Sequence, residues 1–151
     1  MLEVPTTSPW FVLQVDQFSE VVDKHGLSSG NEVLQLYSHI VKAALREVDV
    51  TARLEADKFG LILSGATEDE TVMVINRISQ LIRQIKVMDD EDLKITNSGG
   101  ITSYHGTEDA RELIEHANTA LSFAIEQGRD RVAGYNYTEP SAEDDLASED
   151  S

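Results

Sequence analysis

Five short stretches of the chain carry the apolar or alternating patterns that predict β-strands. Residues 11–15 form a short apolar run that includes β-branched side chains, whereas residues 48–54 and 59–63 alternate between apolar and polar positions. The polar junction between the alternating stretches, residues 55–58, predicts a tight turn and therefore an antiparallel hairpin. The two remaining predicted strands are 94–102 and 131–135.

Four segments show the three- or four-residue spacing of apolar positions that is typical of helices. Two of them begin with a pair at capping-box spacing, Ser29 with Glu32 and Thr67 with Glu70. The predicted helices are 16–24, 29–47, 67–85 and 108–127, the last with Gly128 as its C-terminal cap. The order β-α-α-β-β-α-β-α-β predicts an α+β domain with helices packed on a largely antiparallel sheet.

Charge and composition narrow the class of protein. The 151 residues include 28 acidic and 12 basic side chains, a formal net charge of −16, which argues against nucleic-acid binding and a polybasic membrane anchor. Because cysteine is absent, disulfides, thiol catalysis and thiolate zinc sites are excluded. No apolar stretch approaches the roughly 18 residues of a membrane span, and residues 1–10 lack signal-peptide features. A cytoplasmic protein without membrane insertion is expected.

Acidic residues are concentrated at the C-terminal end of the sequence. Residues 137–151 hold six acids, no base and one large aliphatic side chain, Leu146, which predicts a disordered tail or an interdomain linker. Residues 1–9, with Pro5 and Pro9, are expected to form an irregular N-terminal segment. The folded domain is therefore expected to occupy residues 10–136.

Several short motifs follow one another along this expected domain. A strand ending in Asp-x-Phe precedes a helix that opens with Gly-Asn-Glu-Val-Leu, and an arginine precedes the hairpin. A Ser-x-Gly-Ile strand and a helix of the pattern Ala-x-x-Ala-Leu-x-x-Ala-x-x-x-Gly-Arg complete the series. The motifs occupy residues 15–18, 30–34, 53–59, 98–101 and 117–129. In this order and spacing they resemble the GGDEF domain family, the catalytic domain of diguanylate cyclases, over about residues 11–136.

The resemblance implies a fold and a chemistry. The fold is a palm-like, mostly antiparallel five-stranded sheet flanked by helices, related to nucleotidyl cyclases. In active members of the family, two GTP-loaded domains face each other and form cyclic di-GMP, as a 3′-hydroxyl attacks an α-phosphate. Two divalent metals held by carboxylates activate the attacking oxygen and neutralise the leaving pyrophosphate. Mg²⁺ prefers hard oxygen ligands, so acids are required at those positions.

The family's Gly-Gly-Asp/Glu-Glu-Phe signature reads Glu55-Ala56-Asp57-Lys58-Phe59 in this chain. Asp57 retains the metal-binding acid, Lys58 reverses the charge of the next acid, and Glu55 adds a negative side chain where the family has glycine. The other metal carboxylate of the family corresponds to Gln14, a neutral amide. The metal-binding part of the signature is therefore only partly retained.

Nucleotide-contacting positions differ as well. The family's guanine-contacting Asn and Asp correspond to Val22 and Asn31, and of its phosphate-binding Lys and Arg only Arg129 remains, with Ile125 at the Lys position. Losing one electrostatic contributor commonly costs about 2.7–4 kcal/mol of transition-state stabilisation. We therefore expect a domain that is not an enzyme, with no cofactor and no Mg²⁺. The vestigial residues are Gln14, Asp57, Lys58 and Arg129. Asp16 and Asp57 are expected to be remnant acids, solvated at the old cleft with Lys58 pairing to one of them; the alternative is that they bind one cation weakly.

One ligand-binding motif of the family is retained. Arg46 and Asp49 form an Arg-x-x-Asp that five residues separate from Glu55. In the family, this motif is the inhibitory site for cyclic di-GMP. A guanidinium can grip a phosphate or a guanine edge through two hydrogen bonds, and a carboxylate can accept from guanine. Both side chains are expected near the end of a long helix, pointing the same way. The alternative is an ordinary surface ion pair at a helix end, and an additional arginine of the family's site corresponds to Ser79.

Three hypotheses about function remain open. The first is a receptor that senses cyclic di-GMP through Arg46 and Asp49. The second is a regulatory domain that binds no nucleotide and acts on a neighbouring EAL-type phosphodiesterase domain or another signalling protein. The third is a GTP binder or a weak residual cyclase. No nucleic-acid partner is expected under any of them.

Overall fold

The nine elements of the fold follow the predicted order. The computed structural model describes residues 8–135, so the predicted acidic tail and most of the irregular N-terminal segment lie outside the described residues. The strands are β1 (Ser8–Val15), β2 (Val50–Glu55), β3 (Lys58–Ile62), β4 (Asn97–Tyr104) and β5 (Val132–Gly134). The helices are α1 (Phe18–His25), α2 (Leu27–Ala44), α3 (Glu68–Ile82) and α4 (Ala110–Glu126). Because β1 begins at Ser8, the expected irregular segment 1–9 extends two residues too far.

The five strands form one mixed sheet in the order β2-β3-β1-β4-β5. β1 pairs antiparallel with both β3 and β4, and β2 pairs antiparallel with β3 as the predicted hairpin. Among the strand pairs within residues 8–135, only β4–β5 is parallel. The structure therefore confirms an α+β fold with a mostly antiparallel five-stranded sheet flanked by helices.

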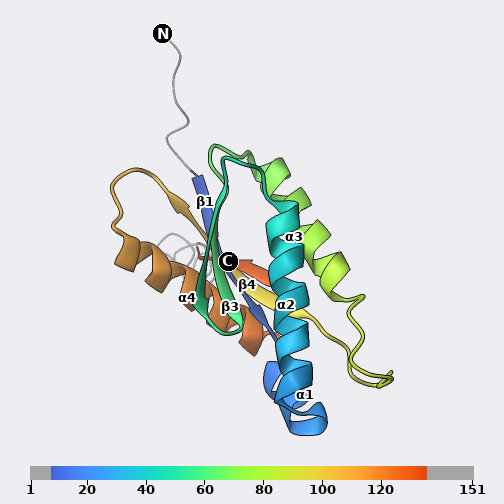
Figure 1. Cartoon of the computed structure of the whole chain (residues 1–151). Coiled ribbons are helices and arrows are strands. Elements are labelled where there is room, and N and C mark those ends of the chain that lie inside the picture. Colours follow the sequence, from blue (N-terminus) through green and yellow to red (C-terminus); the bar gives the residue numbers. More distant parts are fainter. Residues whose placement is uncertain (1–7, 136–151) are drawn as a thin grey trace, which may run out of the picture.

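The central strand β1 separates two layers of helices (Figure 1). Its alternate residues Phe11, Leu13 and Val15 belong to the large core together with residues of α2 and α3. Val12 points to the opposite face and packs against Ala117 and Leu121 of α4. Such alternation follows from the two-residue period of a strand. The sheet is consequently covered by α2 and α3 on one face and by α4 on the other.

Gly100 allows α4 to lie directly on the sheet. A Cβ atom at this position would collide with the backbone of α4 at the Ala117 carbonyl oxygen and the Leu121 amide nitrogen. The neighbouring Gly99 is similarly crowded, since its Cβ would lie 2.6 Å from Leu13 Cδ2. This glycine pair therefore marks a close approach of the α4 backbone to the sheet.

The boundaries of α2 differ from the prediction at both ends. α2 begins at Leu27 without a side-chain cap, and Ser29 is already buried within the helix, so the predicted Ser29–Glu32 capping box is wrong. The reason is Gly26, whose φ of 90° turns the chain directly from α1 into α2. The same helix ends at Ala44 rather than near residue 47, because Leu45 is extended. The capping box of Thr67 and Glu70 at the start of α3 is confirmed.

Candidate functional site

The signature residues form the tip of the β2–β3 hairpin. β2 ends at Glu55 and β3 begins at Lys58, leaving Ala56 and Asp57 as the turn. The Arg53 guanidinium stabilises this turn by donating from Nε and Nη2 to the Ala56 carbonyl oxygen, at 3.0 and 2.7 Å. Val15 of β1 also donates its amide hydrogen to the Asp57 carbonyl oxygen, at 3.1 Å. The tip is therefore fixed against the end of the central strand.

Gln14 and Asp57 meet at this junction. Gln14 pairs with Lys58 in the β1–β3 ladder, and its Nε2 donates to Asp57 Oδ2 at 3.3 Å. The structure thus brings together Gln14 and Asp57, the two positions that correspond to metal ligands in the family resemblance. In this chain the contact is an amide–carboxylate hydrogen bond rather than a pair of carboxylates.

Asp16 is not a solvated remnant, contrary to expectation. Its side chain is 1% exposed. Its Oδ2 accepts from Thr96 Oγ1 at 2.6 Å and from the backbone amide of Asp130 at 3.1 Å, while Oδ1 accepts from Ser98 Oγ at 2.7 Å. Buried carboxylates require such partners. Asp16 therefore ties β1 to β4 and to the segment after α4.

Lys58 pairs within the hairpin rather than with a remnant acid. Its Nζ lies 2.8 Å from Oε2 of Glu55, so the expected pairing of Lys58 with Asp16 or Asp57 is wrong. The hydrogen bond from Lys58, together with its positive charge, lowers the pKa of Glu55. The shared hairpin geometry explains the result, because positions 55 and 58 face each other across the two-residue turn. The added acid and the added base at the tip thus neutralise each other.

Arg129 lies beside the same junction, in a turn that follows α4. Gly128, Arg129 and Asp130 all have positive φ angles, of 120°, 66° and 53°. This left-handed stretch places Arg129 Nε 4.0 Å from Asp16 Oδ1. Its side chain remains 55% exposed, so the guanidinium is available to an anion in solvent. Asp130 in turn accepts from Arg83, with Nη2 at 2.9 Å, a contact between residues 47 positions apart that no local pattern predicts.

The residues at the hairpin do not match a site in which two carboxylates hold Mg²⁺. Gln14 supplies an amide, and both oxygens of Asp16 already accept hydrogen bonds. Among residues 8–135, no three acids or histidines come close enough together to hold a metal ion. Mg²⁺ prefers carboxylate and water oxygens. Asp57 is therefore a retained acid whose partner at position 14 is an amide, and we derive no metal-dependent step from this geometry.

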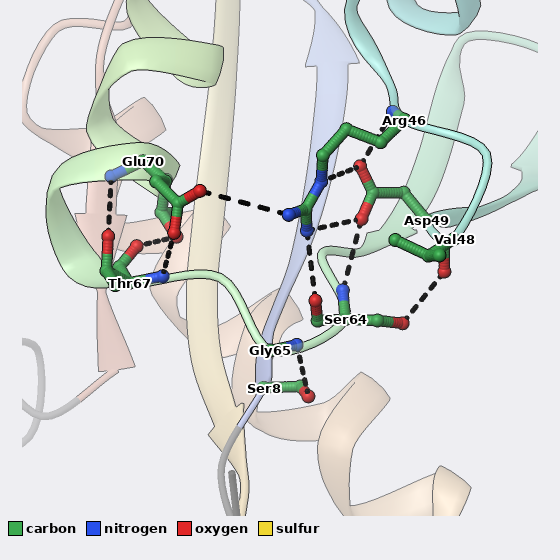
Figure 2. Close-up of polar contacts among 9 residues, drawn as sticks. Ser8, Arg46, Val48, Asp49, Ser64, Gly65, Thr67 and Glu70 are labelled. Atoms are coloured by element: carbon green, nitrogen blue, oxygen red, sulfur yellow. Dashed lines mark hydrogen bonds and ion pairs between the residues drawn. The ribbon is translucent and has the colours of Figure 1, made fainter. Parts of the chain in front are cut away.

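The Arg46–Asp49 motif forms a turn after α2 rather than the end of the helix (Figure 2). The Asp49 amide donates to the Arg46 carbonyl oxygen at 3.0 Å, and the Arg46 amide donates back to Asp49 Oδ2 at 2.8 Å. The guanidinium completes the contact, with Nε 3.1 Å from Oδ2 and Nη2 2.8 Å from Oδ1. The two side chains lie together as predicted. They belong to a turn closed by hydrogen bonds of Asp49, however, and not to the end of the helix.

Asp49 is almost inaccessible, whereas Arg46 faces solvent. Their side chains are 1% and 45% exposed. The Ser64 amide also donates to Asp49 Oδ1, at 3.1 Å, and Arg46 Nη2 donates to the Ser64 carbonyl oxygen at 2.9 Å. Burial acts to raise the pKa of Asp49, but the hydrogen bonds from Arg46 and Ser64 and the positive charge of Arg46 outweigh it, so the pKa is lowered. In this arrangement Asp49 orients the arginine.

Glu70 was not singled out as a site residue from the sequence. It lies at the start of α3, and its Oε2 is 3.8 Å from Arg46 Nη1. The only sequence signal was its place in the capping box with Thr67. Ser79, which stands where the family has a further arginine, instead donates from Oγ to Asn97 Oδ1 at 3.1 Å. The Arg46 site therefore combines one arginine with an acid on the neighbouring helix.

A wide groove lies beside α3, away from Arg46. It has a volume of about 740 Å³ and is lined by residues of α3, β4 and β5. Ser79, Arg83, Asp130 and Arg131 are among its polar residues, and Ile75 and Val132 are among its apolar ones. The groove thus lies at the parallel β4–β5 edge of the sheet.

Comparison with known proteins identifies relatives along most of the chain. A family model described as "Diguanylate cyclase, GGDEF domain" matches residues 7–131. Diguanylate cyclase DosC of Escherichia coli K12 is 32% identical over 123 residues, which are 80% of this chain and 27% of DosC. Diguanylate cyclase A of Treponema denticola is 28% identical over 123 residues, 80% of this chain and 33% of that protein. The chain thus spans about a third or less of these relatives.

Solved structures show the same fold. The GGDEF domain of DgcB from Caulobacter crescentus, in complex with c-di-GMP, superimposes with a TM-score of 0.79 at 20% identity, covering 86% of this chain and 78% of that one. Diguanylate cyclase SiaD of Pseudomonas aeruginosa, in complex with its activator SiaC, gives a TM-score of 0.78 at 28% identity, covering 85% and 50%. The palm-like architecture implied by the sequence is confirmed.

These relatives correct the expectation that the domain is not an enzyme. DosC and diguanylate cyclase A are named as cyclases, and they match across the hairpin region that carries the substitutions. The expectation rested on the substitutions at the family's site positions, and the named activity of these relatives overturns it. The substitutions at Gln14 and Lys58 therefore do not establish inactivity.

No helix in the described part of the chain combines the length and apolar character needed to cross a bilayer.

The family model covers well over half of the sequence. The structure also shows the sheet order, the hairpin and the Arg46–Asp49 turn described above. On these grounds the chain belongs to the GGDEF domain family, the family of diguanylate cyclase domains.

Proposed function

We propose that this domain binds cyclic di-GMP at the Arg46–Asp49 turn and thereby acts as a receptor in cyclic di-GMP signalling. The observation that carries the proposal is the fixed orientation of Arg46. Its Nε and Nη2 are held by Asp49, and Nη2 is also held by the Ser64 carbonyl, yet the side chain is 45% exposed. A guanidinium held in this way loses little rotational freedom when it binds a ligand.

The chemistry of the ligand suits this arginine. Cyclic di-GMP offers two anionic phosphodiesters and two guanine bases with acceptors at O6 and N7. Guanidinium hydrogen bonds to such groups are charge-assisted and geometrically specific. Hydrogen bonding to Asp49 raises the pKa of Arg46 still further, so the side chain stays cationic at any physiological pH. Asp49 serves mainly to orient the arginine, since both of its oxygens already accept hydrogen bonds.

Related domains support the proposal at the level of the fold. The structures of DgcB and of a further microbial GGDEF domain with a TM-score of 0.72 both contain cyclic di-GMP. Their sequence identities to this chain are 20% and 23%. The proposed ligand therefore comes from structures that share this fold. The proposed contact comes from the geometry of Arg46 in this chain.

Isothermal titration calorimetry with cyclic di-GMP tests the proposal. We expect binding by the wild-type protein and a loss of about tenfold or more in Arg46→Ala, because a charge-assisted hydrogen bond is removed. Arg111→Ala is the matched control, since Arg111 is an exposed arginine on α4, across the sheet. Absence of binding by the wild type, or equal binding by Arg46→Ala, would refute the proposal. The former result, with no GTP binding either, would favour a partner-binding regulatory domain, such as one coupled to an EAL-type domain.

A second candidate function is diguanylate cyclase activity at the hairpin. The observation that favours it is the retained Asp57 beside position 14, in a domain whose relatives are named cyclases. Incubation with GTP and Mg²⁺ or Mn²⁺, followed by chromatography of the products, tests it directly. Product that disappears in Asp57→Ala would support this candidate, and absence of product at high protein concentration would argue against it.

A further inference from the structure

Glu70 has one carboxylate oxygen in a hydrogen bond and the other in an ion pair. Oε1 accepts from the Thr67 amide at 2.9 Å, while the Glu70 amide donates to Thr67 Oγ1 at 3.1 Å, completing the capping box of α3. Oε2 has no part in this cap and faces Arg46 Nη1 across 3.8 Å (Figure 2). That separation is an ion pair but is longer than a hydrogen bond. The hydrogen bonds from Thr67 lower the pKa of Glu70, so the carboxylate carries charge at neutral pH.

Arg46 is engaged in a complementary way. Its Nε and Nη2 donate to Asp49 and Ser64, whereas Nη1 makes no hydrogen bond to any residue within 8–135. The turn and the helix therefore present a donor, Arg46 Nη1, beside an acceptor, Glu70 Oε2, and the two atoms are joined to each other by an ion pair and not by a hydrogen bond. Both side chains are about half exposed, at 45% and 51%. This pair can receive a ligand without breaking either the turn or the helix cap.

The donor–acceptor pair matches one edge of guanine. The Watson–Crick edge of guanine places the acceptor O6 next to the donors N1–H and N2–H₂, whereas adenine places a donor where guanine has O6 and an acceptor at N1. An arginine nitrogen on O6 with a carboxylate on N1–H and N2–H₂ therefore suits guanine. Adenine would set donor against donor and acceptor against acceptor. Sites built on such polar contacts reject the wrong partner because buried groups are left unpaired.

We propose that Glu70 is the guanine-specifying residue of the Arg46 site, a role that rests on the cyclic di-GMP binding proposed above. Asp49 cannot accept from guanine without giving up a hydrogen bond, since its two oxygens receive four donors from Arg46 and Ser64. Glu70 supplies the acceptor instead, from a different element of the fold. The recognition unit is thus an arginine on the turn after α2 and a glutamate in the first turn of α3.

Glu70→Gln is a suitable test because it keeps the helix cap. Glutamine is accepted at this position of a capping box, and its amide oxygen can take the hydrogen bond from Thr67. The amide NH₂ then faces Arg46, so the acceptor for guanine is replaced by a donor. Glu68→Gln is the matched control, because it removes the same charge from the same first turn of α3 without touching the Thr67 cap.

Calorimetry with cyclic di-GMP and cyclic di-AMP on the wild type and both variants decides the question. We expect the wild type to prefer cyclic di-GMP, Glu70→Gln to lose about tenfold in cyclic di-GMP affinity and most of that preference, and Glu68→Gln to behave as wild type. If Glu70→Gln binds cyclic di-GMP as tightly as the wild type or more tightly, Glu70 is a bystander or a repelling charge and this inference alone is overturned. If the wild type binds neither dinucleotide, the proposed function fails and the inference fails with it.

Discussion

The side-chain amide of Gln14 donates to the Asp57 carboxylate at 3.3 Å, joining the central strand to the tip of the signature hairpin. An amide satisfies this contact without a cation, because it offers a donor to a lone carboxylate. Two carboxylates at the same distance would instead repel each other unless a cation lay between them. The identity of residue 14 therefore controls how strongly the hairpin depends on divalent cations.

Gln14→Asp should make the protein respond to divalent cations. We expect the variant to have a lower Tm than the wild type in EDTA, because like charges face each other, and to recover it in millimolar Mg²⁺ or Mn²⁺. The wild-type Tm should change little with either cation. Differential scanning fluorimetry measures both effects, and Gln14→Asn serves as the uncharged control. A wild-type Tm that rises as much as that of Gln14→Asp would contradict the prediction.

Asp49 should contribute stability that depends on pH. The pKa of an unfolded Asp is about 3.9, and the pKa of folded Asp49 is lowered, so the folded state holds fewer protons on this group. Its contribution is present in full above the unfolded pKa and is lost as pH falls through the folded value. We expect Asp49→Asn to cost about 1–3 kcal/mol at pH 7 and less below about pH 4. Urea unfolding at several pH values checks this, and a cost that is constant down to pH 3 would refute it.

Asp16 should be a stabilising residue of the fold. Asp16→Ala would leave the hydroxyl of buried Ser98 without its acceptor, at a cost of about 1–3 kcal/mol, and would also remove the acceptor of the exposed Asp130 amide. Asp16→Asn should cost less, since the side chain keeps one acceptor and a hydroxyl can reorient. The control is Asp57→Ala, because Asp57 is half-buried and its carboxylate accepts from Gln14. Equal unfolding free energies for Asp16→Ala and Asp57→Ala would show the assignment to be wrong.

Gly100→Ala should separate α4 from the sheet. The new methyl group meets the backbone of α4, which cannot rotate away as a side chain can, so we expect a loss of at least about 1–3 kcal/mol. Gly60→Ala is the matched control, because its Cβ would meet the flexible Leu54 side chain at 3.3 Å. Chemical denaturation compares the two. A Gly100→Ala protein as stable as Gly60→Ala would mean that α4 does not lie as close to β4 as the structure shows.

The order of elements could be predicted because it depends on local patterns. The hairpin around Asp57 and the capping box of Thr67 and Glu70 are encoded within a few residues, and both were found in the structure. The start of α2 was misplaced because the left-handed conformation of Gly26 begins the helix without a side-chain cap. Periodicity carries no signal for such a turn.

The site could be predicted only where its parts are close in sequence. Arg46 and Asp49 are three residues apart, so the sequence predicts their contact, although its periodicity extends the helix into the turn that they close. The partners of Asp16 are 80, 82 and 114 residues away, and nothing in its neighbourhood indicates that it is buried. No local pattern indicates that Glu70 approaches Arg46, because the contact depends on how α3 packs beside the turn.

The hairpin tip is attached to the domain through very few groups. Within residues 8–135, Glu55 and Lys58 pair with each other, Arg53 holds the Ala56 carbonyl, and the junction to β1 consists of Gln14 and the Val15 amide. Asp16 accepts hydrogen bonds from Thr96, Ser98 and Asp130, and none of these residues belongs to the tip. For protein engineering, residues 55–58 are consequently a segment that could be replaced by the corresponding residues of a related domain. The rest of the domain would keep its own sequence.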